Sequence, residues 1–205
     1  MDTSAEVAEK LLQIKAIKLS PQNPFTWASG IKSPIYCDNR LVLSYPDVRD
    51  FIKEQLALTS EEFGGFDRIA GVATAGIAHG MLLADALDKP FAYVRSKAKE
   101  HGRQNLVEGL LEAGDRVLVV EDLISTGGSS LQAVEAVRQI GCTVVGVIAI
   151  FSYGFERAET AFKEANCPFK TLSNYDDLII QAVKSGYVDS SSLTMLTDWR
   201  KTIGK

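Results

Sequence analysis

A short apolar run that ends in two adjacent carboxylates constrains this chain more than any other feature. Residues 117–120 read V-L-V-V, rich in β-branched types and too few for a helix, and so predict a fully buried parallel strand. Glu121 and Asp122 follow directly, before a turn of hydroxyl-bearing residues and glycines. An apolar stripe over residues 129–140 then predicts an amphipathic helix. The stretch therefore predicts a strand, an acidic pair, a glycine turn and a helix.

The chemistry of this turn suits a phosphorylated sugar. Glycines let successive backbone N–H groups point at one spot, and a helix start adds the positive end of its dipole. Ionised carboxylates accept hydrogen bonds, as a ribose diol requires. The alternative is an ordinary turn, which is less favoured because desolvated carboxylates need partners. The sequence contains neither G-x-x-x-x-G-K-[ST] nor G-x-G-x-x-G at this turn, so it supports neither a P-loop nor a dinucleotide site.

From Phe66 onward, predicted strands alternate with predicted helices. The expected strands are 69–73, 91–94, 117–121, 143–151 and 169–172, and the expected helices are 77–87, 129–140, 155–166, 175–184 and 192–202. This order predicts an α/β fold with a mainly parallel central sheet flanked by helices. Residues 73–76, 95–103 and 121–129 each follow a strand, so we expect them to converge at the carboxyl edge of the sheet, where such folds bind ligands.

The first 60 residues differ from the rest in their predicted secondary structure. Helices are expected over 3–16, capped by Ser4, and over 45–58, opened by Ser44 and Pro46. Prolines and glycines interrupt the apolar residues of the intervening segment. This pattern predicts short irregular strands that lie over another part of the protein. We therefore expect a small N-terminal hood region, 1–60, and an α/β core, 61–205, in one compact unit.

Composition narrows the class of protein. A chain of 205 residues that is 46% hydrophobic can form one domain with a small appendage. The net charge of −4 gives no global attraction to nucleic acid or membrane, and we expect neither as a partner. The three cysteines are scattered, which argues against disulfides and zinc and favours a reducing, cytoplasmic location. The N-terminal helix carries charges throughout and is not a signal peptide.

Two further loops carry unusual chemistry. Residues 71–77, G-V-A-T-A-G-I, could cradle a phosphate with main-chain N–H groups, although tight packing of strand against helix is the favoured explanation from this loop alone. Residues 95–103, R-S-K-A-K-E-H-G-R, hold four Arg or Lys and one Glu, a local charge of +3 in an acidic protein. A solvated loop is the alternative there. Because residues 96–110 show no good helix or strand pattern, we expect an active-site lid.

These stretches resemble a known family. Residues 121–129 resemble the ribose-phosphate motif of type I phosphoribosyltransferases, and the hood segment F-T-W-A-S-G-I-K-S-P, with the basic loop, is similar to that of the orotate phosphoribosyltransferases. The resemblance implies the type I fold and transfer of a phosphoribosyl group from phosphoribosyl pyrophosphate (PRPP) to orotate, giving orotidine 5′-monophosphate and pyrophosphate for pyrimidine synthesis. It also implies Mg²⁺ held mainly by PRPP, with no direct protein ligand, and a homodimer that shares the basic loop across its interface.

The resemblance also assigns roles to residues. Lys99, His101 and Asp122 would be catalytic. The residues implied to bind PRPP are Ala73, Thr74, Arg95, Lys99, His101, Glu121, Asp122, Leu123, Ile124, Ser125, Thr126, Gly127, Gly128 and Ser129. Those implied to bind orotate are Tyr36, Lys32, Ser125 and Arg157. A cis peptide bond between Ala73 and Thr74 is also implied. From the residue alone, Tyr36 could equally be a core aromatic.

The chain departs from the family at informative positions. Ser96 and Ala75 stand where a lysine is common, and Gly154 stands where many relatives have an arginine for the orotate carboxylate. Arg157 and Arg40 are both candidates to replace that arginine. His79 is expected to serve packing or lie at the surface. Two other functions were weighed: a phosphoribosyltransferase for another base, disfavoured by the hood, and a PRPP-sensing regulator, disfavoured by the retained basic loop.

Overall fold

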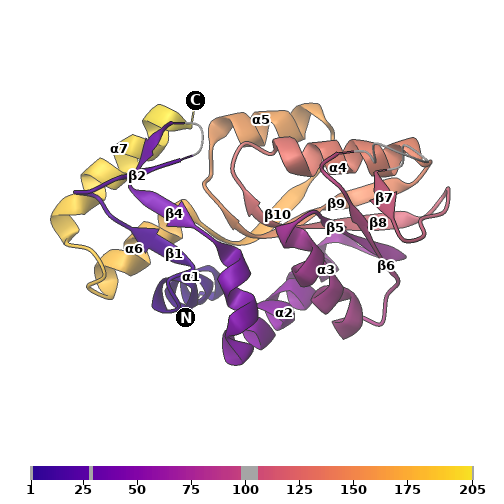
Figure 1. The fold of residues 1–205 in the computed structure, drawn as a ribbon, viewed down its shortest axis with the longest axis horizontal. Coiled ribbons are helices and arrows are strands. Elements are labelled where there is room, and N and C mark those ends of the chain that lie inside the picture. The colour runs from indigo at the N-terminus through magenta and orange to yellow at the C-terminus, as the bar shows by residue number, and fades with distance from the viewer. Residues whose placement is uncertain (1, 28–29, 98–105, 205) are drawn as a thin grey trace.

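The computed structural model describes residues 2–27, 30–97 and 106–204. Its centre is a six-stranded sheet with the strand order β10-β9-β8-β5-β6-β7 (Figure 1). These strands are β5 (Arg68–Val72), β6 (Phe91–Val94), β7 (Val107–Glu108), β8 (Arg116–Ile124), β9 (Thr143–Ser152) and β10 (Phe169–Asn174). Neighbouring strands are parallel except β7, which pairs antiparallel with β6. The predicted α/β fold with a mainly parallel sheet is confirmed.

Helices cover both faces of this sheet. They are α1 (Thr3–Gln13), α2 (Pro46–Ser60) and α3 (Ala75–Ala86) on one face, and α4 (Gly128–Gln139) and α5 (Glu156–Glu164) on the other (Figure 1). Alternation along β8 supplies both layers: Leu118 and Val120 pack with the first group, Val117 and Val119 with the second, and all four side chains are fully buried. This apolar run was the clearest signal in the sequence.

The strand order brings the expected loops together. Strand β5 lies between β6 and β8, so the segments after β5 and β6 and the end of β8 meet at one edge. Helix α3 follows β5 and α4 follows β8, each starting at that edge. The predicted convergence is therefore confirmed for the described parts of the three segments.

Several predicted boundaries were wrong. Strand β8 does not end at Glu121 but pairs with β9 as far as Ile124, because the longer β9 offers it a partner. The segment 96–110 was expected to hold no strand, yet β7 lies within it and completes the edge beside β6. Helix α1 is capped by Asp2, whose side chain accepts a hydrogen bond from the Ser4 N–H, so Ser4 is not the cap. Helix α2 begins at Pro46, with Tyr45 rather than Ser44 at the cap position.

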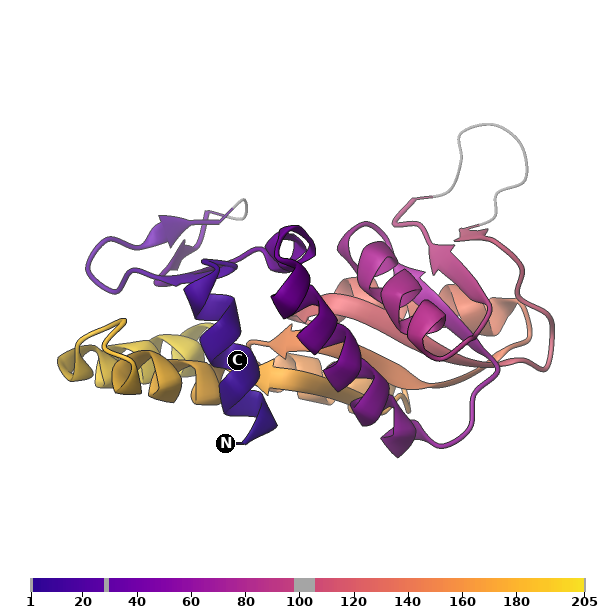
Figure 2. The ribbon, with the colours of Figure 1, turned by 90° about the horizontal axis from the view of Figure 1, so that it is seen from below.

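The hood strands lie to one side of the sheet. Strand β1 (Ile17–Leu19) pairs with β4 (Ile35–Cys37), and β2 (Phe25–Thr26) pairs with β3 (Lys32–Ser33), both antiparallel. In Figure 2 these strands lie above α6 (Tyr175–Lys184) and α7 (Leu193–Ile203). Short 3₁₀ helices η1 (Asn39–Ser44), η2 (Glu61–Phe63) and η3 (Ser190–Ser192) complete the chain.

The hood rests on the C-terminal helix. The Trp199 indole N–H donates to the Lys32 carbonyl at 3.0 Å, and the Trp199 ring meets Trp27 edge-on, with centroids 5.8 Å apart. Helices α1 and α2 instead pack on α6, α3 and the sheet strands. The division of the chain at residue 60 stays a prediction. No described helix combines the length and apolarity needed to cross a membrane.

Candidate active site

The acidic pair is held at the end of β8. Glu121 is 5% exposed and Asp122 is half-buried. The Glu121 carboxylate accepts hydrogen bonds from the hydroxyls of Ser129 at 3.2 Å and Ser130 at 3.4 Å, and from the Asp122 N–H at 3.1 Å. Glu121 thus ties the strand to the first turn of α4. The contribution of Ser130 was not predicted; its place next to Ser129 was the only signal.

Burial makes this pair a proton acceptor. Desolvation, with a smaller effect from the Asp122 charge, raises the pKa of Glu121 to about 8. The pKa of Asp122 is also raised, chiefly by burial, while the Glu121 hydrogen bond and the Arg40 charge oppose that rise. The pair therefore tends to keep a proton near neutral pH. Hydrogen-bond donors or a cation placed between the carboxylates would favour their ionised forms.

The glycine turn is shaped for close approach. Gly127 has φ of +81°, which disfavours other residues, and a Cβ there would lie 2.8 Å from a Phe162 ring atom. Helix α4 starts at the next residue, so its first N–H groups lack helical partners and can meet an anion. Ser125 and Thr126 are half-buried beside them. This is the arrangement expected of a phosphate site.

Leu123 and Ile124, which were predicted to contact PRPP, have core side chains. Ile124 is fully buried in one apolar cluster, and Leu123 packs against the other. Any contact of these two residues with PRPP would therefore use the main chain, and that role stays a prediction.

The loop after β5 contains the implied cis peptide bond, between Ala73 and Thr74. Its glycines, however, are explained by packing. A Cβ at Gly71 would lie 2.7 Å from the Gly76 carbonyl, and one at Gly76 would overlap the Val120 carbonyl. The small residues therefore let α3 press onto β5 and β8, as the favoured explanation expected. A phosphate-binding role for Ala73 and Thr74 stays a prediction.

The basic loop is described only at its edges. Arg95 forms an ion pair with Glu108 at 3.5 Å, and Lys97 is exposed. Lys99 and His101, predicted to be catalytic, lie outside the described residues. Ala28 and Ser29 of the hood lie outside them as well. The roles of Lys99 and His101 stay predictions.

The hood offers an aromatic surface and a lysine. Tyr36 is 42% exposed, which disfavours the core explanation, and its ring centroid lies 5.8 Å from that of Phe25. The Lys32 ammonium donates to the Thr26 hydroxyl at 2.7 Å. Both predicted orotate-binding residues therefore lie on β3 and β4, with polar groups that are not in the core.

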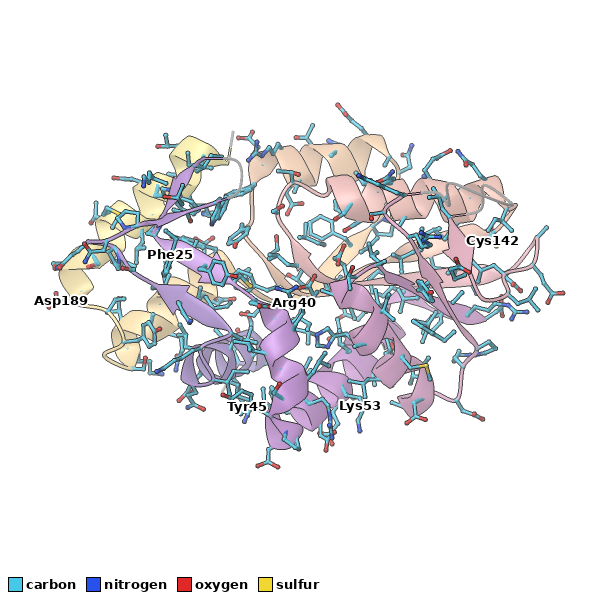
Figure 3. The ribbon with its side chains drawn as sticks, in the orientation of Figure 1. Phe25, Arg40, Tyr45, Lys53, Cys142 and Asp189 are labelled. Atoms are coloured by element: carbon cyan, nitrogen blue, oxygen red, sulfur yellow. The ribbon has the colours of Figure 1, made fainter. Side chains whose placement is uncertain are left out.

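Three arginines differ in how they are placed to replace the missing one. Figure 3 shows Arg40 between the hood strands and the sheet, where its guanidinium bonds Asp38 at 2.6 and 2.9 Å. Arg157 lies exposed on α5, 5.3 Å above the ring of Phe155. Arg200, which sequence reasoning did not consider, donates to the Gly154 carbonyl at 2.9 Å. Of these, Arg40 is the one whose charge acts on the acidic pair.

A buried polar contact that the sequence did not reveal also reaches the pair. Asn39 is fully buried and donates to the Asp122 carbonyl at 2.8 Å. His79 is 1% exposed, so its expected packing role is confirmed. Burial lowers the pKa of His79 to about 4, and the Asn39 backbone partly opposes this.

The described residues hold no group of three or more His, Cys, Asp or Glu side chains that could bind a metal ion. The two carboxylates of the acidic pair are oxygen ligands, which suit a hard cation such as Mg²⁺ when substrate phosphates supply the other ligands. A metal held mainly by the substrate, with no direct protein ligand, stays a prediction.

Comparison with known proteins places the chain. A sequence model of the phosphoribosyl transferase domain matches residues 44–189. An orotate phosphoribosyltransferase of Bacteroides thetaiotaomicron is 58% identical over 195 residues, which cover 95% of this chain and 92% of that protein. One from Listeria innocua is 54% identical over 202 residues, covering 98% and 97%.

Solved structures agree with these sequence matches. Leishmania donovani UMP synthase superposes with a TM-score of 0.84 at 26% identity, covering 97% of this chain and 42% of that one. Orotate phosphoribosyltransferase from Aeropyrum pernix gives a TM-score of 0.77 at 28% identity, covering 89% and 99%. With the acidic pair and glycine turn in place, the chain belongs to the phosphoribosyltransferase family, among the orotate phosphoribosyltransferases.

Proposed function

We propose that this protein transfers the 5-phosphoribosyl group of PRPP to orotate, giving orotidine 5′-monophosphate and pyrophosphate for pyrimidine synthesis. The observation that carries the proposal is the buried acidic pair, Glu121 and Asp122, directly before a glycine turn and the start of α4. Relatives at 54–58% identity carry the name of this enzyme.

The site suits the bonds that change. The bond from ribose C1 to pyrophosphate breaks, and the electron pair leaves with the pyrophosphate while an orotate ring nitrogen, having lost its proton, bonds to C1. Asp122 and Glu121 accept hydrogen bonds from the ribose hydroxyls, and residues 125–129 bind the 5′-phosphate at the start of α4. Such a reaction needs no protein nucleophile. It needs held reactants and a neutralised leaving group.

The leaving pyrophosphate meets positive charge. Mg²⁺, bound mainly by PRPP oxygens, would neutralise part of its charge. Arg95, Lys99 and His101 would close over the remainder, and Ala73 and Thr74 would offer main-chain donors. Exclusion of water by this closure protects the activated ribose from hydrolysis.

The base lies under the hood. Tyr36 stacks on the pyrimidine ring, Lys32 and Ser125 bind its polar edge, and an arginine binds its carboxylate. Arg157 and Arg40 were both candidates for this contact. The electrostatic interaction of Arg40 with both Asp122 and Tyr36 favours Arg40 of the two.

The protein acts in the cytoplasm as a homodimer with the basic loop shared between subunits. The described cysteines Cys37, Cys142 and Cys167 are all free, which suits a reducing compartment. Mixing Lys99→Ala with Asp122→Asn subunits should restore activity, because one mixed site then has both intact residues. No recovery despite proven subunit exchange would contradict the shared loop.

The function is tested by incubating purified protein with PRPP, Mg²⁺ and orotate, with uracil, adenine and xanthine as competing bases. We expect PRPP-dependent consumption of orotate alone. Turnover of another base would identify that base as the substrate in place of orotate. PRPP binding without turnover of any base would indicate a regulatory protein.

A further inference from the structure

A buried amide joins the hood to the acidic pair. Asn39 begins η1, two residues after hood strand β4, and its side chain is fully buried. Its amide nitrogen donates to the Asp122 carbonyl at 2.8 Å, and its amide oxygen accepts from the Cys37 thiol at 3.3 Å. Because one partner is an acceptor and the other a donor, the amide has a single satisfied orientation.

A third contact involves the same segment. Helix α3, which starts at the Ala73–Thr74 loop, packs against η1, and the Asn39 backbone partly opposes the lowering of the pKa of His79 on that helix. The low pKa of His79 keeps its ring neutral at physiological pH, so this contact adds no charge near the carboxylates. Asn39 therefore contacts a hood strand, helix α3 and strand β8.

The sheet leaves the Asp122 peptide in need of such a contact. Strand β5 pairs with β8 only as far as Gly71 opposite Val120, and β5 ends at Val72. Beyond that point β8 has β9 on one side and no strand on the other among the described residues. The Asn39 amide takes the place of the absent strand at the Asp122 carbonyl.

We propose that Asn39 is a positioning residue, which fixes the Asp122 peptide and so aims the Asp122 carboxylate at the ribose hydroxyls. The same amide links that carboxylate to the hood that covers the base. This inference rests on the proposed ribose-binding role of Asp122. Loss of the amide is expected to weaken ligands that carry the ribose diol and to spare ligands that lack it.

The test compares two ligands in three variants. Ribose 5-phosphate carries the diol, whereas pyrophosphate does not, and calorimetry gives the dissociation constant of each. For Asn39→Ala we expect ribose 5-phosphate to bind about 2- to 12-fold more weakly, the range for one neutral hydrogen bond, with pyrophosphate binding within about twofold. Asn39→Asp should lose more, since its carboxylate would face the Asp122 carbonyl.

Asn174→Asp is the matched control. Asn174 also donates its amide to an acidic partner, Asp177, at 2.7 Å, but it caps α6 rather than contacting β8. We expect it to lower the melting temperature without changing the ratio of the two dissociation constants. Equal weakening of both ligands in Asn39→Ala, or no change in either, would overturn the positioning role.

Two further measurements keep the test decisive. If Asn39→Ala does not fold, Cys37→Ala removes the thiol that fixes the amide and should give a smaller loss of the same selectivity; unchanged selectivity would overturn the inference. Steady-state kinetics with orotate and PRPP separate this inference from the function. A wild-type protein without turnover would refute the transferase, while selective loss of ribose 5-phosphate binding would still support Asn39.

Discussion

The acidic motif and the hood meet at one site but are held in different ways. In the motif, Glu121 bonds Ser129 and Ser130, eight and nine residues away. The hood depends on distant partners: Trp199 donates to Lys32 across 167 positions. Glu121 and the start of α4, where we propose that the ribose phosphate binds, are therefore joined locally, whereas the hood, where we propose that the base binds, depends on distant segments; the Asn39 amide links the two regions. Substitutions should distinguish the two.

The largest effect is expected in the local motif, from Asp122→Asn. The amide cannot accept charge-assisted hydrogen bonds from the ribose diol, each worth about 1.5–3 kcal/mol, so kcat/KM for PRPP should fall at least about 100-fold. Stability should stay equal or rise, because the change removes one of two adjacent buried carboxylates. Steady-state kinetics and thermal unfolding measure the two effects.

An Asp122→Asn protein that lost activity and stability together would contradict this separation. It would mean that the carboxylate holds the fold and that the motif is not independent of its surroundings. Asp177→Asn, in the cap of α6, is a control that removes a carboxylate away from β8.

The second-largest effect is expected from Arg40→Ala, which tests binding of the base at the hood. If Arg40 binds the orotate carboxylate, KM for orotate should rise by about 13- to 160-fold, the range for a hydrogen bond to a charged group. KM for PRPP should change less. Arg157→Ala is the matched control, with an expected change below about twofold, since its guanidinium lies over the Phe155 ring. The reverse pattern in the two variants would assign the carboxylate to Arg157.

The third prediction concerns pH and returns to the motif. The folded protein keeps a proton on the acidic pair that the unfolded chain has released, because the pKa of Glu121 is raised to about 8 from an ordinary 4.5. The free energy of unfolding should therefore fall as pH rises through this interval, by at most about 1.4 kcal/mol per pH unit.

The useful window is pH 6.5 to about 8. Below it, His79 acts in the opposite direction: its pKa is lowered from 6.5 to about 4, so stability rises with pH there. Denaturant unfolding of Glu121→Gln should show no decline within the window, since an amide does not ionise. A decline equal to that of the wild type would assign the proton to another group.

The same contrast explains what the sequence could reveal. The apolar run 117–120, the acidic pair and the glycine turn are consecutive, so the sequence alone predicted that strand and its turn. The alternation of strands and helices predicted the parallel sheet, and the family resemblance implied the cis peptide bond that the structure contains. The end of β8 was not predicted because it depends on the length of β9. Strand β7 was not predicted because two residues are too few to show an alternating pattern.

The contacts that hold the hood were not predicted for a related reason. Asn39 and Trp199 have no local pattern that indicates a partner, and each finds its partner only when distant segments fold together. The arginine near Gly154 shows the same limit. The departure at Gly154 was visible in the sequence, but the nearness of Arg200 to its carbonyl was not.

The smallest expected effect is the sharpest test of remote support for the hood. Trp199→Phe keeps an aromatic ring beside Trp27 but removes the indole donor to the Lys32 carbonyl. One neutral hydrogen bond is worth about 0.5–1.5 kcal/mol, so KM for orotate should rise by roughly 2- to 12-fold while the dissociation constant of ribose 5-phosphate stays unchanged. Trp199→Phe would thus weaken binding of the base without weakening binding of the sugar, although residue 199 lies in the last helix of the chain. If ribose 5-phosphate binding weakened equally, the hood and the motif would form one cooperative unit, and the local character of the motif would be limited to its sequence.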